Sequence, residues 1–353
     1  MSAHLETTEQ QMREKQLLPD RYPNGELFLC DLGDVVLKDD TASMEHPIFA
    51  LSTKPDTRVR EYDHKGNTVT ITPSVKGLAT IHDKDILIFA ISQIMEAKNR
   101  GLPYSKEVSF NANDFLRFAN RMTNGRGYLG LKEALTRLRG TTIQTNILTG
   151  GQEQTDTFGL IDKSRIRRRM RDGTVTDWSV TLCDWLFNAI EANEVLTIHK
   201  NYFRLRKPLE RRIYELARKH CGAQKSWKVS LDVLLKKSGS QSSKKKFKQL
   251  LKPIVDYDHL PDYSVSFEGK DHVVFFNRRF IEATVTTGRI VLQTETYTKA
   301  RNTAPGWDIY VLEQHWRGWM QEKQKARPQN PDKAFIGFCR SWYKKNGKPA
   351  GVY

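Results

Sequence analysis

The sequence predicts an α+β fold of two successive units with the same order of elements, between an N-terminal arm and a C-terminal helical appendix. Two observations predict the repeat. The run Val108–Asn111 (V-S-F-N) matches Val229–Asp232 (V-S-L-D) 121 positions later, and in both a β-type run leads directly into a helix cap. An apolar helical stripe follows in each unit, and the two stripes are 116 positions apart. We therefore expect two related domains rather than one.

Residues 1–78 give weaker signals and are predicted to form the N-terminal arm. A turn at Lys65-Gly66-Asn67 with Val69 and Ile71 after it predicts a hairpin. The arm is therefore expected to contain some strand.

The first repeated unit is predicted over residues 79–200. A helix is expected behind an Asp83 N-cap, then a strand at 108–110, and a second helix behind an Asn111 cap. A glycine turn at 125–127 precedes a third helix, and β-type runs at 141–147 and 158–180 predict a hairpin. This order is typical of a winged helix-turn-helix domain. The residues expected on the apolar faces of the second and third helices are Phe115, Phe118, Ala119 and Met122, and Leu131, Ala134, Leu135 and Leu138.

The second unit is predicted over residues 201–295 with the same order. Pro208 begins its first helix, a Ser238-Gly239-Ser240 turn precedes its third, and two β runs joined at Gly269-Lys270 form the hairpin. The third helix is expected to bury Phe247, Leu250, Leu251 and Ile254, and further β-type sequence runs from 280 to 294. The fold prediction is therefore two tandem winged helix-turn-helix domains.

The appendix, residues 296–353, is predicted to hold two helices rich in aromatic residues. Trp316 and Trp319 line the first, and Phe338 and Trp342 line the second, which starts at Asn330-Pro331. We interpret these aromatic side chains as the core of the appendix, with a base-stacking surface as the alternative.

Charge is the first indication of function. The 353 residues carry 57 Lys plus Arg against 41 Asp plus Glu, a net charge of +16 with a pI near 9.6. Residues 200–254 hold 17 basic and three acidic residues, whereas the first 63 residues hold 7 basic and 13 acidic ones. Such polarised charge attracts phosphate polymers or anionic membranes. Because the longest strongly apolar run has six residues and the N-terminus lacks an apolar core, we expect no membrane span, no secretory signal and a cytoplasmic location.

Enzymatic chemistry finds little support in the sequence. The run Gly125–Gly130 spells G-x-G-x-x-G, but a helix rather than a strand precedes it, so a dinucleotide site is not expected. Phosphate-loop and paired-histidine motifs are absent, and the four cysteines are at least 38 residues apart. We predict a protein without catalytic activity, metal or cofactor. The glycines instead suggest backbone amides near a DNA phosphate, with a plain turn as the alternative.

The candidate DNA-binding residues follow from the helix faces. The third helix of the second unit has an apolar side and a cationic side, which is what a helix in the major groove requires. The first unit offers a similar helix and an arginine-rich hairpin. The predicted residues are Lys244, Lys245, Lys246, Lys248, Gln249, Lys252 and Lys270 in the second unit, and Arg126, Lys132, Arg137, Arg139, Arg167, Arg168 and Arg169 in the first.

Two stretches of the chain resemble the plasmid replication initiator protein A family: Arg206–Gly222 (RKPLERRIYELARKHCG) and Asn330–Cys339 (NPDKAFIGFC). The resemblance extends from about Leu78 to the C-terminus. It implies two winged-helix domains that bind direct repeats (iterons) in double-stranded DNA at an origin, promote opening, and recruit the host initiator and replicative helicase. In related initiators the first winged helix also dimerises, and the dimer represses its own gene, so a monomer–dimer equilibrium is a further expectation.

Three alternatives stay open at this stage. A transcriptional repressor with the same fold would bind one palindrome rather than several direct repeats. An origin nuclease or primase would need a metal site that the sequence does not indicate. A structural nucleoid protein would show little preference between target and random DNA.

Overall fold

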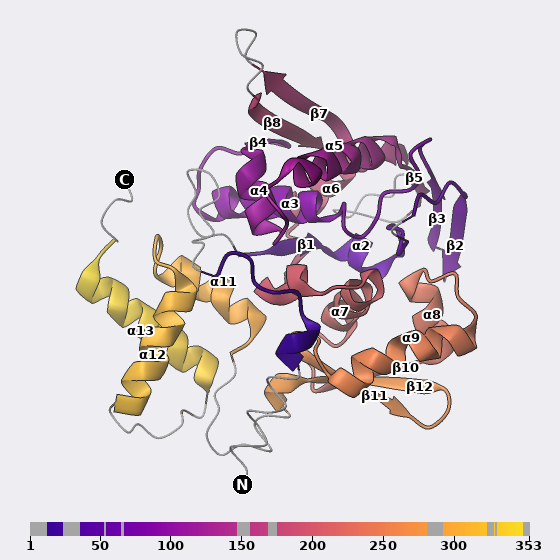
Figure 1. Ribbon diagram of the computed structural model, residues 1–353. Helices are drawn as coiled ribbons and strands as arrows, with labels where there is room; N and C mark the ends of the chain where they lie inside the picture. Colours follow the sequence, from indigo (N-terminus) through magenta and orange to yellow (C-terminus); the bar gives the residue numbers. More distant parts are fainter. Residues whose placement is uncertain are drawn as a thin grey trace.

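The computed structural model describes residues 13–23, 36–52, 54–64, 67–146, 156–168, 175–280, 292–322, 328 and 330–348. Figure 1 shows two units stacked one above the other, with a separate group of helices at one side. The β-type run predicted for residues 280–294 lies largely outside the described residues.

The first unit has the predicted order of elements, except that two strands at residues 142–145 and 156–159 lie between its third helix and its hairpin and belong to another sheet. They are α3 (Asp85–Asn99), β4 (Glu107–Phe110), α4 (Ala112–Phe118), α5 (Gly125–Gly140), β7 (Ile161–Arg168) and β8 (Val175–Leu182). The strands form an antiparallel sheet in the order β4-β8-β7. As predicted, Asn111 caps α4, its side chain accepting the Asn113 N–H at 2.8 Å. The predicted stripe of α4 was wrong at Met122, which lies beyond the end of the helix and is exposed.

The second unit repeats this arrangement. Its elements are α7 (Pro208–His220), β10 (Ser226–Ser230), α8 (Leu231–Ser238), α9 (Lys244–Tyr257), β11 (Tyr263–Glu268) and β12 (His272–Asn277). The strand order, β10-β12-β11, is the same as in the first unit. Gly239 ends α8 with φ of +71°, a conformation that favours glycine, and Ser243 then caps α9 through the Lys246 N–H. The internal repeat is therefore present in sheet topology as well as in sequence.

The described residues between 36 and 78 are part of the folded body rather than a separate arm. This region forms β1 (Lys38–Asp40), α2 (Thr41–Glu45), β2 (Arg60–His64) and β3 (Asn67–Thr72). The β2–β3 hairpin occurs as predicted, but β3 also pairs with β5 (Thr142–Thr145), which pairs with β6 (Asp156–Gly159). Strand β1 pairs with β9 (Val195–Thr197). The boundary predicted at residue 78 therefore cuts through sheets that join this region to the first unit.

The linking and C-terminal elements complete the fold. They are α6 (Asp184–Glu191), the 3-10 helix η2 (Lys200–Arg204), α11 (Thr294–Thr303), α12 (Ile309–Glu322) and α13 (Pro331–Asn346). The two predicted C-terminal helices are present, while α11 was not predicted. These three helices pack around a second core that includes Leu312, Trp316 and Phe335.

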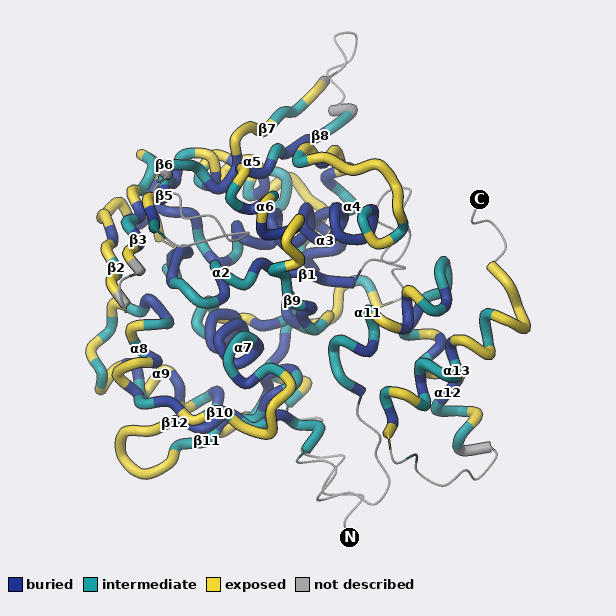
Figure 2. The backbone as a smooth tube through the Cα atoms, turned by 180° about the vertical axis from the view of Figure 1, so that it is seen from behind, coloured by how far each residue is buried: buried dark blue, intermediate teal, exposed yellow. Residues whose placement is uncertain are grey.

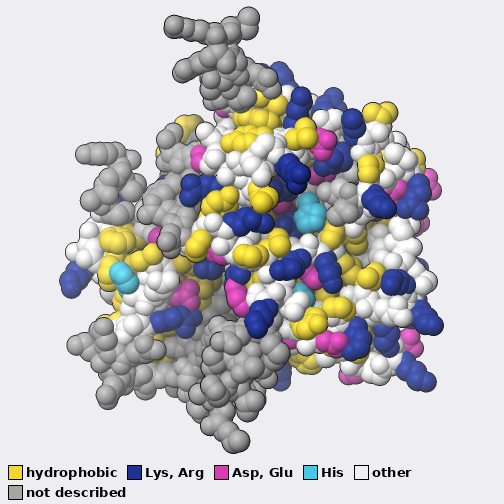
Figure 3. Space-filling view, viewed as in Figure 1, with side chains coloured by type: hydrophobic (Ala, Val, Ile, Leu, Met, Phe, Trp, Pro, Cys, Tyr) yellow, Lys and Arg dark blue, Asp and Glu magenta, His cyan; other side chains and the backbone are white. Residues whose placement is uncertain are grey.

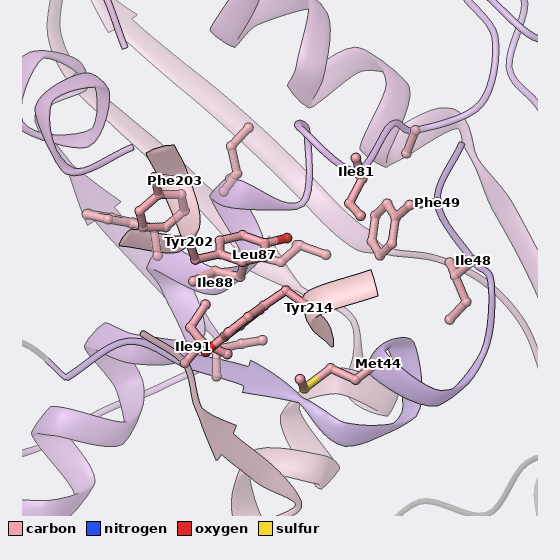
Figure 4. Close-up of a cluster of buried hydrophobic side chains, with 14 of the residues drawn as sticks. Met44, Ile48, Phe49, Ile81, Leu87, Ile88, Ile91, Tyr202, Phe203 and Tyr214 are labelled. Atoms are coloured by element: carbon pink, nitrogen blue, oxygen red, sulfur yellow. The ribbon is translucent and has the colours of Figure 1, made fainter. Parts of the chain in front are cut away.

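One continuous core serves both repeated units. In α3 every residue from Ile86 to Ile91 is completely buried, so the helix is enclosed on all sides rather than amphipathic. Figure 4 shows Leu87, Ile88 and Ile91 of this helix packed close to Tyr202 and Tyr214. Figure 2 shows α7 as a largely buried helix in the middle of the molecule. Because the core crosses the boundary predicted at residue 200, the two units form one body.

No helix in the described ranges is long and apolar enough to cross a membrane. Within the same ranges, no group of three or more His, Cys, Asp or Glu side chains could hold a metal ion.

Candidate nucleic-acid interface

Helix α9 separates its apolar and cationic sides largely as the sequence predicts. Phe247, Leu251 and Ile254 are buried. The prediction was wrong for Leu250, which is 39% exposed because it lies toward the edge of the apolar stripe. The exposed charged and amide side chains are Lys245, Lys246, Gln249, Lys252 and Asp256. The helix thus presents three cations, one amide and one carboxylate to solvent while its other side holds it to the second unit.

Three lysines of α9 have partners within the protein. Lys244 pairs with Asp232 at 2.7 Å and with Asp271 at 2.9 Å. The hydrogen bonds to these carboxylates raise the pKa of Lys244. Lys252 pairs with Asp256 one turn further along, at 2.6 Å. These carboxylates offset part of the positive charge predicted for this surface.

Lys248 contacts a backbone carbonyl and an aromatic ring rather than a carboxylate. Its Nζ donates to the Lys270 carbonyl at 2.6 Å and lies 5.2 Å from the centre of the Phe267 ring. It therefore fastens the β11–β12 hairpin to α9. Lys270 itself is exposed in the turn of that hairpin. In the described part of the chain, Lys245, Lys246 and Lys270 have no acidic partner, so they are the most available cations of the second unit.

The first unit presents a similar surface on α5. Leu131, Ala134, Leu135 and Leu138 are all buried, as predicted. Arg126, Lys132 and Arg139 are exposed. Figure 3 shows Lys and Arg side chains over the areas where Figure 1 places α5 and the α8–α9 region.

Arg137 does not belong to this surface. Its guanidinium makes two hydrogen bonds to Asp83, of 2.7 and 2.8 Å, and only 20% of its side chain is exposed. The hydrogen bonds to Asp83 raise the pKa of Arg137. Asp83 was predicted as the N-cap of the helix that begins at Asp85, but Lys84 occupies that position. The Asp83 side chain instead accepts the Thr80 N–H. The pair ties α5 to the start of α3, and Arg137 is committed to structure.

The start of α5 also differs from the prediction. Gly125 and Gly127 lie in the first turn of the helix rather than in a separating turn, and Asn124 caps it by accepting the Gly127 N–H. A Cβ at Gly127 would stand 1.9 Å from the Met122 carbonyl oxygen. This close approach requires glycine and sets the short connection between α4 and α5. A role for these glycines near a phosphate stays a prediction.

The arginine-rich hairpin is described only in part. Arg167 on β7 is 60% exposed and lies 3.8 Å from Asp177 on β8. Arg168 is the last residue of β7, and Arg169 lies outside the described residues.

The feature that sequence reasoning missed is the buried polar side of α7. Arg211 pairs with Asp85 of α3 at 2.6 Å, and Arg121 pairs with the other oxygen of Asp85 at 2.7 Å. Arg212 donates to the carbonyls of Ser43 and Met44 in α2. Three of the 17 basic residues counted in residues 200–254, namely Arg211, Arg212 and Arg218, are therefore inside the molecule.

A lysine continues this network. Lys84 is completely buried and pairs with Asp39 at 2.6 Å and with Glu215 of α7 at 3.2 Å. Burial alone would lower the pKa of Lys84, but the charges of Asp39 and Glu215 outweigh it and raise that pKa. Tyr202 donates to Glu215 at 2.6 Å. The signal in the sequence was the set of charges beside apolar runs, at Asp39, Lys84 and Asp85, but only the fold shows that they meet.

Comparison with known proteins identifies the family of this chain. The family model described as "Replication initiator protein A" matches residues 38–265. A putative replication protein of Wigglesworthia glossinidia brevipalpis is 38% identical over 264 residues, which covers 72% of this chain and 94% of the relative. This chain belongs to the replication initiator protein A family.

Among solved structures, two of domains 2 and 3 of RctB are similar to this initiator, with TM-scores of 0.49 and 0.48. Both are 13% identical to this chain. The first alignment covers 66% of this chain and 94% of the RctB chain, and the second covers 69% and 99%.

The family match corrects the extent of the resemblance seen in the sequence. It begins at Lys38, the first residue of β1, rather than near Leu78, and it ends at Val265 within β11. The stretch Asn330–Cys339, which also suggested the family, lies outside the matched range. In this initiator the family match thus covers the N-terminal strands and α2 and ends before the C-terminal helices.

Proposed function

We propose that this initiator binds direct repeats (iterons) in double-stranded DNA at a plasmid origin, through the exposed cations of α5 and α9. The observation that carries the proposal is the repeated unit: apart from β5 and β6, which lie between α5 and β7 in the first unit, both copies have the same element order and strand order, and both present exposed cations on the corresponding helix. The order of elements supports a winged helix-turn-helix interpretation, and in such domains the second helix of the motif enters the major groove.

The rest of the proposal is supported by family membership. The bound initiator promotes opening of the duplex and recruits the host initiator and the replicative helicase, without catalysing a reaction and without metal or cofactor. It acts in the bacterial cytoplasm on plasmid DNA. A dimer formed through the first unit represses the initiator's own gene.

Footprinting on the replicon that encodes the protein, at about 150 mM salt, tests the proposal. We expect regularly spaced protection over several direct repeats, with the two helices in grooves about one helical turn, roughly 34 Å, apart. Protection of a single inverted repeat at a promoter would instead indicate a repressor. Equal protection of random DNA would indicate a structural nucleoid protein, and metal-dependent cleavage an origin nuclease.

A further inference from the structure

The aromatic residues of the C-terminal helices fall into two groups. Trp316 is 1% exposed and packs with Phe335 in the second core. Trp319, on the next turn of α12, is 41% exposed. With Phe338 and Trp342 of α13 it lines a groove of about 680 Å³ between the two helices. Phe338 and Trp342 are partly buried against the second core, so the interpretation as core fits them as well as Trp316, while Trp319 is exposed.

The rings beside the groove form a row. The ring centres of Trp319 and Phe338 are 6.1 Å apart, and those of Phe338 and Trp342 are 5.8 Å apart. Trp307, which does not line the groove, packs edge-on against Trp342 at 5.5 Å. Small residues of α13 line the same groove, namely Ala334, Gly337 and Ser341. A Cβ built at Gly337 meets nothing within 4 Å. The groove therefore has open space beside a series of aromatic rings.

The described residues that line the groove carry charge of one sign. Lys345 lines it, and none of its described lining residues is acidic. The sequence from 333 to 348 contains Lys333, Arg340, Lys344, Lys345 and Lys348 and no acidic residue. A ligand with negative charge and with flat or apolar faces therefore suits the groove.

We propose that this groove binds single-stranded DNA, with bases stacked on the aromatic row and phosphates near the cations of α13. Both an acidic amphipathic helix and a nucleic acid strand would satisfy the charge. The row of rings favours the strand, because every base has a flat face that stacks on an aromatic side chain whatever the sequence. The site lies on different helices from α5 and α9 (Figure 1), so the proposal goes beyond duplex binding and does not depend on it.

The test uses the full-length chain and a fluorescein-labelled dT12 oligonucleotide, with binding followed by fluorescence anisotropy. Gly337→Leu fills the groove without meeting other atoms. Gly318→Leu is the matched control, because Gly318 lies on α12, has the same open space around its Cβ and does not line the groove. We expect the control to bind like the unchanged protein and Gly337→Leu to bind at least about tenfold more weakly, since stacking supplies much of such affinity.

Two further experiments separate binding in the groove from binding through α9. Both variants are also compared in a Lys245→Ala/Lys246→Ala background, which removes binding of the oligonucleotide through α9. Trp319→Ala, which removes an exposed ring without filling the groove, is expected to weaken binding similarly and to reduce quenching of tryptophan emission by unlabelled dT12.

Equal affinity of the Gly337→Leu and Gly318→Leu proteins would overturn the proposal, and so would failure of the unchanged protein to bind dT12. Either result would leave an acidic protein segment as the better occupant. Duplex binding to the protected repeats is measured in parallel and is expected to be the same in both variants. Failure of the groove and failure of the duplex interface are therefore distinguishable.

Discussion

Leu250 and Leu251 are neighbours on α9 with opposite environments. Leu251 is completely buried in the shared core, while Leu250 is 39% exposed and lines a second groove with Leu51 and Leu209. The matched position in the first unit, Ala134, is small and buried. The matched helices of the two units thus face the core with the same side, but side chains at matched positions are buried to different extents.

This difference gives a stability prediction. Leu251→Ala should lower the free energy of unfolding by about 2–5 kcal/mol, because it removes buried contacts and leaves a cavity. Leu250→Ala should lower it by less than about 1 kcal/mol, because water already reaches that side chain. Urea denaturation followed by circular dichroism measures both. Equal effects of the two substitutions would contradict the assigned burial.

The sequence predicts which helix positions are buried, but it does not predict which side chains pair with each other. The apolar faces of α5 and α9 follow from helical periodicity, and seven of the eight positions expected to be buried on these two helices are buried. Arg137 and Lys244 were assigned to the interface on the same reasoning. Their partners Asp83 and Asp271 are 54 and 27 positions away, and only the folded chain brings them together.

At the scale of elements, α7 differs from its sequence pattern, which predicts an amphipathic helix with an exposed polar side. Leu216 and Ala217 predict an ordinary amphipathic helix that begins the second unit. Its polar residues Arg211, Arg212 and Glu215 are as buried as its apolar ones, and they contact α2 and α3. Ion pairs removed from water are costly to break, because the remaining charge has no solvent to stabilise it. This helix therefore fixes the second unit against the first.

Breaking one buried pair tests that role. Arg211→Met leaves the Asp85 carboxylate buried with one partner fewer and should lower the free energy of unfolding by about 3–5 kcal/mol. Lys106→Met is the control, because Lys106 pairs with Asp184 on the surface, where solvent screens the pair and its loss changes stability little. Adding Asp85→Leu to Arg211→Met should recover part of the loss. A loss no larger than that of the control, measured by urea denaturation, would contradict a structural role for α7.

At the scale of the whole molecule, the order of elements could be predicted and the division into domains could not. The order depends on local caps, turns and periodicity, all of which lie within about 20 residues of sequence. The joining of the N-terminal region depends on pairs such as Lys38 with Thr197, which are 159 positions apart. Such pairing leaves no local pattern. The net charge of +16 likewise does not show which cations are exposed.

The number of exposed cations without acidic partners sets the expected salt dependence of duplex binding. Among the described candidates, six are exposed and have no acidic partner: Arg126, Lys132, Arg139, Lys245, Lys246 and Lys270. If each neutralises one phosphate, the plot of log K against log salt has a slope of about −5, since each contact releases about 0.9 counterion. Paired cations such as Lys244 contribute less, because their carboxylate partners already neutralise them.

The double variant Lys245→Ala/Lys246→Ala should make the slope less steep by about 2 and weaken binding to every duplex, whatever its sequence. Both side chains are exposed, so the fold is expected to be unchanged by circular dichroism. Lys76→Ala removes an exposed lysine outside α5 and α9 and serves as the control. Titration of a labelled duplex between about 50 and 200 mM salt gives the slopes. A slope near zero for the unchanged protein would exclude this interface, while an unchanged slope in the double variant would move it away from α9.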